Sequence, residues 1–171
     1  AYASFSPGTP SHFLGFQLNE RLKLNMVHVP YKGSAPQLND LIGGQVLLGF
    51  TQMQGAMQQV QAGKLHAIAI TSLERSRFLP QVPTLAELGH RDLSLQVWFG
   101  LVAPVATPPK VIEVITAAVV KAQGDTNYRT KLEAQGFEVP RESGSAFEAT
   151  ILNDTARWAR VVQITGFRAN D

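Results

Sequence analysis

Residues 26–36 read Met-Val-His-Val-Pro-Tyr-Lys-Gly-Ser-Ala-Pro and hold the signals for a strand, a turn and a helix start. Residues 26–29 predict a strand that ends at Pro30, because proline cannot donate to a sheet ladder. Ser34 is predicted to cap the next helix, with Pro36 in its first turn. A strand that leads directly into a helix indicates a βαβ unit on a parallel sheet.

The same alternation extends outward from this stretch, from the start of the chain to about residue 71. Short apolar runs alternate with helix-like segments that glycines end. This pattern is typical of a doubly wound α/β domain. We expect strands at 2–4, 46–50 and 65–71, the last of the fully buried kind, and helices at 11–24, 34–42 and 53–61.

The rhythm changes after residue 71. Three prolines stiffen residues 103–109, which we interpret as a crossing between two domains. The segment that follows is largely helical. We expect a short helix at 84–88, strands at 93–102 and 137–139, and helices at 109–123, 126–135 and 145–165.

The composition is typical of a globular protein and argues against several classes of function. Of the 171 residues, 44% are hydrophobic and 16% are charged, which is too apolar for a disordered chain. The net charge is only +2 and basic residues do not cluster, so we expect no nucleic acid partner. Cysteine is absent and the four histidines are scattered, so thiolate chemistry and a metal site are not expected. The sequence shows no membrane span and no signal peptide pattern, which indicates a soluble chain, cytosolic or already processed.

Two predicted strand-to-helix turns carry the candidate chemistry. Residues 4–12 read Ser-Phe-Ser-Pro-Gly-Thr-Pro-Ser-His, and residues 29–36 contain Tyr31 and Lys32. Such turns present free backbone N–H groups and the positive end of a helix dipole, which suits a carboxylate or a phosphate. The same residues also suit an ordinary helix cap and a solvated surface, and the residues alone leave both interpretations open.

Taken together, these segments resemble a known family. Residues 4–12 are similar to the Ser-x-Gly-x-Gly-Thr-x-x-His loop of Bug-type receptors, and residues 28–33, His-Val-Pro-Tyr-Lys-Gly, resemble the most recognisable motif of that family. The chain is identified as a member of the substrate-binding proteins of tripartite tricarboxylate transporters. Further blocks occur in the family's order at 43–46, 62–65, 80–87 and 98–104.

The resemblance implies two α/β domains that clasp a ligand as a type II periplasmic-binding-protein flytrap. Residues 1–102 would form the ligand-binding second domain, and residues 103–109 the interdomain crossing. Residues 110–171 would form the C-terminal helical part of the first domain, whose N-terminal part this sequence lacks. The helices would then expose apolar side chains, and the chain would self-associate, exchange its C-terminal segment with another copy, or be a piece of a longer protein. Those side chains are Val111, Ile112, Val114, Ile115, Val119, Leu132, Phe147, Ile151, Trp158, Val161 and Val162.

The resemblance also implies a periplasmic receptor that captures a small di- or tricarboxylate or aromatic acid for membrane transporter subunits. It implies no cofactor and no catalysis. Two positions depart from the family pattern: Ser6-Pro7 replaces a glycine and a polar residue, and Thr51 stands where aspartate is common. Without that aspartate, a ligand that lacks an amine is expected. The predicted ligand-binding residues are Ser4, Ser6, Gly8, Thr9, His12, Tyr31, Lys32, Gly33, Ser34 and Thr51.

Two alternatives stay open. The receptor could present its ligand to a membrane signalling sensor instead of a transporter. A small hydrolase or isomerase that uses Ser6 or His12 is less favoured, because no Gly-x-Ser-x-Gly elbow and no base with an orienting partner can be found in the sequence.

Overall fold

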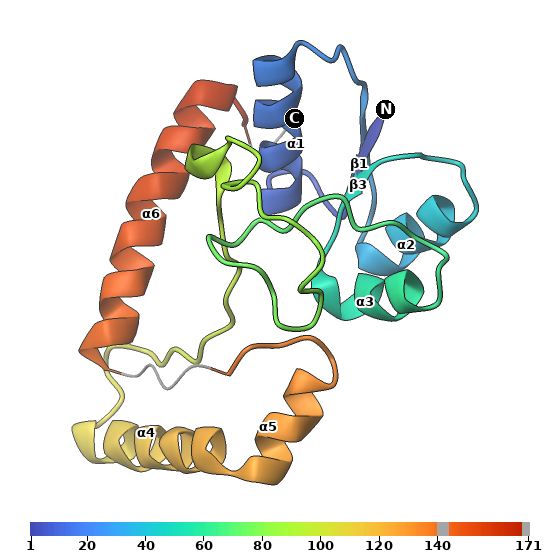
Figure 1. Cartoon of the computed structure of the whole chain (residues 1–171). Helices are drawn as coiled ribbons and strands as arrows, with labels where there is room; N and C mark the ends of the chain where they lie inside the picture. The colour runs from blue at the N-terminus through green and yellow to red at the C-terminus, as the bar shows by residue number, and fades with distance from the viewer. Residues whose placement is uncertain (140–143, 169–171) are drawn as a thin grey trace. The chain divides into compact units, whose positions relative to one another are not determined.

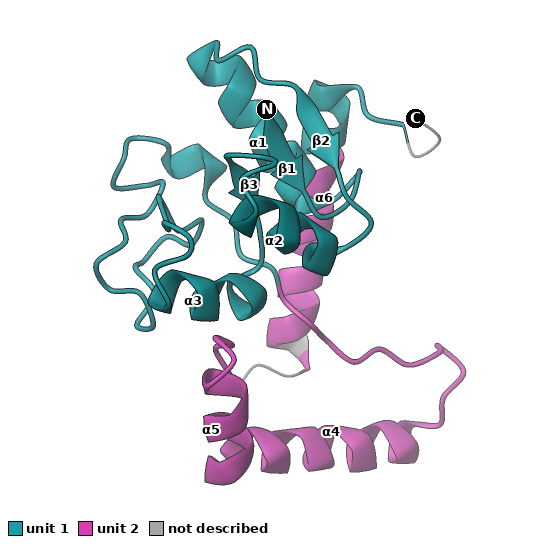
Figure 2. Ribbon diagram, turned by 90° about the vertical axis from the view of Figure 1, so that its right-hand side faces the viewer, with its two compact units in different colours: residues 1–97, 161–171 teal, residues 98–160 magenta. Residues whose placement is uncertain are grey.

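A computed structural model describes residues 1–139 and 144–168 (Figure 1). The chain divides into two compact units (Figure 2). Unit 1 contains residues 1–97 and 161–171, and unit 2 contains residues 98–160. The assignment of residues 1–102, 103–109 and 110–171 to separate domains stays a prediction. In the part of the chain that the structure describes, no helix has both the length and the apolar character of a membrane span.

Unit 1 is built on a three-stranded parallel sheet in the order β2-β1-β3. The strands are β1 (Tyr2–Ser4), β2 (His28–Pro30) and β3 (Gly49–Phe50). The chain starts at the central strand, crosses to one side through α1 (Pro10–Leu22), and crosses to the other side through α2 (Ser34–Ile42). α3 (Met53–Gln61) follows β3 and packs against α2. The predicted doubly wound α/β fold is therefore confirmed.

The two faces of the sheet follow from the alternation of side chains along the strands. Tyr2 faces α1, where its ring lies so close to Gly15 that a Cβ there would come within 2.2 Å of Tyr2 Cε2. Gly49 faces α2, where a Cβ would meet the side chain of Leu41 at 2.8 Å. Thus α1 and α2 cover opposite faces, and Figure 1 shows β1 and β3 between them.

Two strands are shorter than predicted. β2 begins at His28, two residues later than expected, and ends at Pro30, which is included in the strand and pairs with Ser4. β2 is an edge strand, and its next residue, Tyr31, donates its N–H to Ser4 O at 2.9 Å, so the missing donor of Pro30 faces away from the ladder. The expected strand at 46–50 is reduced to Gly49–Phe50.

The helix boundaries differ by one or two residues. α1 ends at Leu22, two residues early, because Lys23 adopts the left-handed conformation with φ 51°. The expected cap at Ser34 is wrong, since Gly33 occupies the cap position with φ 115° and Ser34 is already helical. Glycine reaches that φ without the steric cost that serine would meet.

Most of the segment that follows α3 is irregular. The expected buried strand at 65–71 is wrong: the segment makes a single bridge, Ile70 to Thr84, and Ile68 is 66% exposed. The expected helix at 84–88 is a turn. The expected strand at 93–102 begins as a 3-10 turn, η1 (Arg91–Leu93), and forms no strand, although Leu95 N–H donates to Thr71 O at 2.7 Å.

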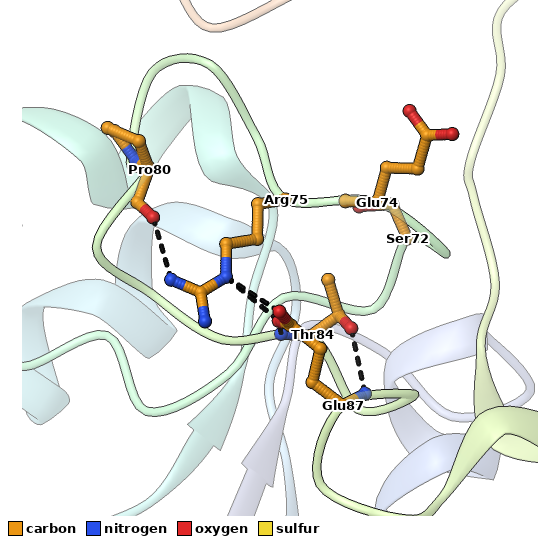
Figure 3. A network of polar contacts seen from close by, with 6 residues as sticks. All are labelled: Ser72, Glu74, Arg75, Pro80, Thr84 and Glu87. Atoms are coloured by element: carbon orange, nitrogen blue, oxygen red, sulfur yellow. Dashed lines mark hydrogen bonds and ion pairs between the residues drawn. The ribbon is translucent and has the colours of Figure 1, made fainter.

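A polar network holds this irregular segment together (Figure 3). Thr84 and Glu87 cap each other: Thr84 N–H donates to Glu87 Oε2 at 2.7 Å, and Glu87 N–H donates to Thr84 Oγ1 at 3.1 Å. Arg75 donates to both carboxylate oxygens of Glu87 and to Pro80 O. These contacts hold the pKa of Glu87 below its usual value, first through Arg75 and then through the Thr84 N–H.

Unit 2 contains an irregular segment, residues 98–108, and helices with little burial. α4 (Pro109–Gly124) and α5 (Thr126–Glu133) contain no buried residue, and α6 (Ser145–Thr165) has the bounds expected from the sequence. The expected strand at 137–139 is absent from the described residues of this unit. The predicted exposure holds for Val111, Ile112, Val114 and Ile115, whereas Val161, which belongs to unit 1, is buried.

Candidate functional site

The carboxyl ends of the three strands lie at one edge of the sheet, and each strand leads into a turn. The strands end at Ser4, Pro30 and Phe50, and α1, α2 and α3 begin three to six residues beyond them. In a sheet of order 2-1-3, the direction of winding reverses between β1 and β3, and ligands bind in the crevice outside this point. The topology therefore places the candidate site at the turns that follow β1, β2 and β3.

A chain of hydrogen bonds shapes the first turn. Phe5 N–H donates to Ser11 Oγ at 3.3 Å, and Ser11 and Thr9 share a hydroxyl bond of 2.9 Å. Thr9 Oγ1 donates to Ser6 O at 2.6 Å, so Ser11 supplies the proton between the two hydroxyls. The hydroxyls of Thr9 and Ser11 thus hold the turn. Thr9 is a predicted ligand-binding residue, and its contact with a ligand stays a prediction.

Two histidines join this turn to the sheet. His12 of α1 stacks on His28 of β2 with ring centroids 4.2 Å apart, and His28 stacks on Tyr2 at 5.0 Å. His28 Nε2 lies 2.7 Å from Ser4 Oγ, and Gly8 N–H donates to His12 Nδ1 at 3.2 Å. Sequence analysis missed His28 as part of the site, although the strand alternation places it beside Tyr2 in the register of β1 and β2.

Both histidines are neutral at neutral pH. Burial, and secondarily the neighbouring His12, lowers the pKa of His28 to about 4. Burial also lowers the pKa of His12. The edge of the sheet therefore offers dipoles and N–H groups from this pair, not imidazolium charge.

The second turn is bonded to the first. Tyr31 N–H donates to Ser4 O at 2.9 Å, and Gly33 N–H donates to Phe5 O at 2.7 Å. The Tyr31 hydroxyl donates to Asp40 Oδ2 at 2.8 Å, and this bond raises the pKa of Tyr31. Lys32 is exposed at the tip. The two predicted turns are therefore neighbours, and the Tyr31 hydroxyl and the Gly33 N–H are used within the protein.

The free donors of the site are the first amides of the two helices. The first turn of an α-helix leaves its N–H groups without partners inside the helix. In α2 these groups belong to Ser34 and Ala35, since Pro36 has none. In α1 they belong to Ser11 and His12, because Pro10 has no N–H and Phe13 N–H already donates to Thr9 O. The amides of the two predicted turns were expected to be donors; among their residues, Ser34 and His12 were named individually and Ala35 and Ser11 were not.

A buried glutamine fixes α2 to the sheet. Gln37 is fully buried, and its Nε2 donates to Ala3 O at 3.1 Å and to Phe50 O at 3.0 Å. Because both amide protons are used on two different strands, the start of α2 cannot shift along the edge without losing a bond. A polar residue on the apolar side of a short helix was the available signal for this role.

The third turn places one more predicted residue at the edge. Thr51 directly follows β3, and its buried Oγ1 has no hydrogen-bond partner among the described residues. Ser34 Oγ donates to Gln52 Oε1 at 3.5 Å, so the second and third turns also meet. A buried hydroxyl without a partner is costly.

The arrangement suits binding better than catalysis. Ser4 and His28 form a hydroxyl–imidazole pair, but Ser4 is completely buried. His12 Nδ1 is occupied by the Gly8 N–H and does not contact Ser6 through any bond among the described residues. No group of three potential metal ligands occurs within the described residues.

Known proteins are similar to this chain in sequence and in fold. Residues 1–167 match the family described as the tripartite tricarboxylate transporter family receptor. Protein BugT of Bordetella pertussis is 34% identical over 168 residues, which cover 97% of this chain and 51% of BugT. The chain thus spans about half the length of the curated relatives it matches first.

Solved structures give the same result. MatC from Rhodopseudomonas palustris with bound malate has a TM-score of 0.81 and 30% identity over 94% of this chain and 56% of MatC. An R. palustris protein with adipate has a TM-score of 0.86 and 28% identity over 96% of this chain and 56% of that one. The matching family is described as a receptor, and another similar structure is that of the periplasmic binding protein BugD, so the enzyme alternative is not supported. The chain belongs to the tripartite tricarboxylate transporter receptor family.

Proposed function

We propose that this chain is the ligand-binding half of a periplasmic receptor that captures a small carboxylate for the membrane subunits of a tripartite transporter. The observation that carries the proposal is the pairing of two helix starts at one sheet edge. The Gly33–Phe5 hydrogen bond of 2.7 Å joins the turn before α2 to the turn before α1. The free amides of both helices therefore point to one region.

Carboxylate is the ligand class that this edge fits. Free N–H groups and the positive ends of two helix dipoles stabilise an anion. Neutral His12 and His28 add no charge, and Lys32 is exposed at the turn, so selectivity rests on directed hydrogen bonds. The structure of MatC contains malate, and that of the second R. palustris protein contains adipate. Both support a carboxylate as the ligand here.

Thr51 narrows the expected ligands to carboxylic acids without an amine. A carboxylate at this position would hold an ammonium group, whereas a hydroxyl gives it no charge partner. Thr51→Asp is expected to weaken malate and adipate binding by repulsion and to allow aspartate binding. Unchanged selectivity in this variant, measured by competition among these three acids, contradicts the role of Thr51.

Calorimetry tests the proposed function. The chain is titrated with malate, adipate, a tricarboxylate, an aromatic acid, aspartate and a neutral sugar. Binding of at least one amine-free carboxylate, without binding of the sugar, is expected. Tight binding of a sugar or a peptide, with no carboxylate bound, overturns the proposal.

A proline substitution tests the two-helix arrangement itself. Ser34→Pro removes one donor at the first position of α2, where proline is tolerated. We expect a loss of about tenfold in affinity, since a charge-assisted bond contributes about 1.5–3 kcal/mol. Thr126→Pro makes the same change at the first residue of α5 in unit 2 and is expected to leave affinity unchanged. Equal effects of the two variants contradict the site.

The transport role and the signalling alternative are separated by the captured partner. Immobilised receptor loaded with its carboxylate is incubated with solubilised membranes. Recovery of integral transporter subunits supports the proposal, and recovery of a sensor kinase supports the alternative.

A further inference from the structure

The C-terminal segment of unit 1 places an aromatic ring on the first turn. Phe167 lies 5.6 Å from the His12 ring and 5.4 Å from the Phe13 ring, edge to face in both cases. A Cβ added to Gly8 would come within 2.8 Å of Phe167 Cζ. All four residues belong to unit 1. Phe167 therefore contacts both the turn and the first residues of the helix that follows it.

This ring is the outer end of an aromatic row that runs into the core. His12 stacks on His28 at 4.2 Å, and His28 stacks on the buried ring of Tyr2 at 5.0 Å. Phe167 contacts the His12 ring and is the last ring of the row. Aromatic pairs of this kind contribute beyond the area they bury, and a row holds each ring in one orientation.

The orientation of His12 matters because its ring accepts a backbone bond. Gly8 N–H donates to His12 Nδ1, and Gly8 has φ 68°, a conformation that other residues seldom adopt. Pro7 and Pro10 supply no donors to this turn. If His12 turned away, the turn would lose one of the few bonds that fix its shape.

We propose that Phe167 is a positioning residue that holds His12 and the turn at residues 6–12 in the anion-binding conformation. It acts through His12 and Gly8 and does not itself contact the ligand. The inference rests on the proposed function, because it assigns to the C-terminal segment control over the affinity of that site. Phe167 lies far along the chain from the turn, so no sequence motif joins the two.

The first test follows His12 by NMR without any ligand. Phe167→Ala exposes the outer face of His12, and the pKa of His12, which burial lowers, is expected to rise towards its ordinary value. The Gly8 amide signal is expected to shift as its bond is lost. Phe167→Tyr keeps the ring and is expected to restore both signals. Ile164→Ala changes a residue of the same segment that is 70% exposed, and it is expected to alter neither.

The second test measures affinity for adipate and malate. Phe167→Ala is expected to weaken binding about tenfold, or about 1.4 kcal/mol, because the donors of α1 are no longer held in place. Phe167→Tyr and Ile164→Ala are expected to stay within about twofold of the wild type. This contrast separates positioning from a general loss of stability.

A double-mutant cycle tests the contact between Gly8 and Phe167. Gly8→Ala brings both backbone strain and a clash with the ring, whereas in the Phe167→Ala background only the strain remains. Gly8→Ala is therefore expected to cost less stability in the Phe167→Ala background than in the wild type. Additive effects on the free energy of unfolding contradict the contact.

The outcomes distinguish this inference from the proposed function. An unchanged titration of His12 in Phe167→Ala overturns the inference, whatever the wild type binds. A changed titration with unchanged affinity also overturns it, because the shape of the turn would then not control binding. A wild type that binds no carboxylate overturns the proposed function, while the NMR result alone then decides whether Phe167 shapes the turn.

Discussion

Unit 1 and unit 2 obtain their structure in different ways. The buried apolar side chains of the described residues all lie in unit 1, including Tyr2, Phe13 and Leu14 around the sheet. α4 and α5 of unit 2 contain no buried residue and begin at local signals, a proline at the first turn of α4 and the Asp125 cap of α5. Local chemistry therefore determines where helices begin in unit 2, whereas packing on the sheet determines the positions of the site residues in unit 1.

Two matched leucine substitutions give the largest expected difference. Leu14 of α1 is 2% exposed, and Leu152 of α6, in unit 2, is 64% exposed. Leu14→Ala is expected to lower the free energy of unfolding by about 2–5 kcal/mol, because it leaves a cavity in a packed core. Leu152→Ala is expected to change it by less than about 0.5 kcal/mol. Urea unfolding measures both, and equal losses would remove the contrast between the units.

The exposed face of α4 gives the second prediction, which concerns association. Val111 and Ile115 lie four residues apart on α4 and are 45% and 42% exposed. We predict that the chain self-associates through such faces. The double variant Val111→Lys with Ile115→Glu is expected to weaken association by roughly 3 kcal/mol, the contribution of two buried aliphatic side chains.

The control for association changes an equally apolar position of unit 1. Leu47 is 89% exposed, and Leu47→Glu is expected to leave the association constant unchanged. Light scattering over a concentration series measures the constants. A wild type that stays monomeric at all concentrations contradicts the prediction, as does a control that dissociates as readily as the double variant.

Capping in the two units gives a smaller contrast. Thr84 is fully buried and shares reciprocal bonds with Glu87, whereas the Asp125 carboxylate accepts the Tyr128 N–H at an exposed helix start. Thr84→Ala is expected to cost about 2 kcal/mol and Asp125→Ala about 0.5 kcal/mol, the two ends of the range for capping residues. Thermal unfolding of both variants checks the order, and a larger loss for Asp125→Ala would reverse it.

Lowering the pH is expected to destabilise unit 1 through protonation of His28. The pKa of His28 is lowered to about 4, so the folded state binds fewer protons than the unfolded chain. This contribution to stability is present above the ordinary pKa of about 6.5 and is lost as pH falls towards 4. The lowered pKa of Glu87 acts in the same direction at lower pH.

Unfolding free energies at several pH values between 7 and 4 measure this loss. His28→Asn removes the titrating ring and is expected to flatten the dependence in that range. All four histidines lie in unit 1, so their NMR titrations report on this unit alone. A His28 that titrates at its ordinary value refutes the explanation.

Sequence patterns predicted the elements of this protein where local signals are strong. The bounds of α6 agree with the prediction, and α4 differs by one residue. Strands were overpredicted at 65–71 and 93–102, because apolar character alone does not show whether a partner strand exists. β2 ends at Pro30, and Pro30 still pairs with Ser4 because an edge strand tolerates its missing donor; edge position is a property of the sheet.

The two turns of the site could be predicted from the sequence, but the residues that hold these turns in place could not. The two turns were found because a strand that runs into a helix has a recognisable pattern. Gln37, His28 and Phe167 were missed because each acts through contacts with distant segments. The hydroxyls of Ser4, Thr9 and Tyr31 were expected to assist the ligand, and in the structure each bonds within the chain. Their ligand contacts stay a prediction.

The most direct test of the account is an NMR titration of the chain with malate or adipate, read at the backbone amides. Signals of Ser11, His12, Ser34 and Ala35 are expected to move together and to saturate with one dissociation constant. The amides of α4 and α5 in unit 2 are expected to stay in place. Saturable shifts confined to α4 and α5, with the two helix starts of unit 1 unchanged, would contradict the central claim that the sheet edge of unit 1 binds the carboxylate.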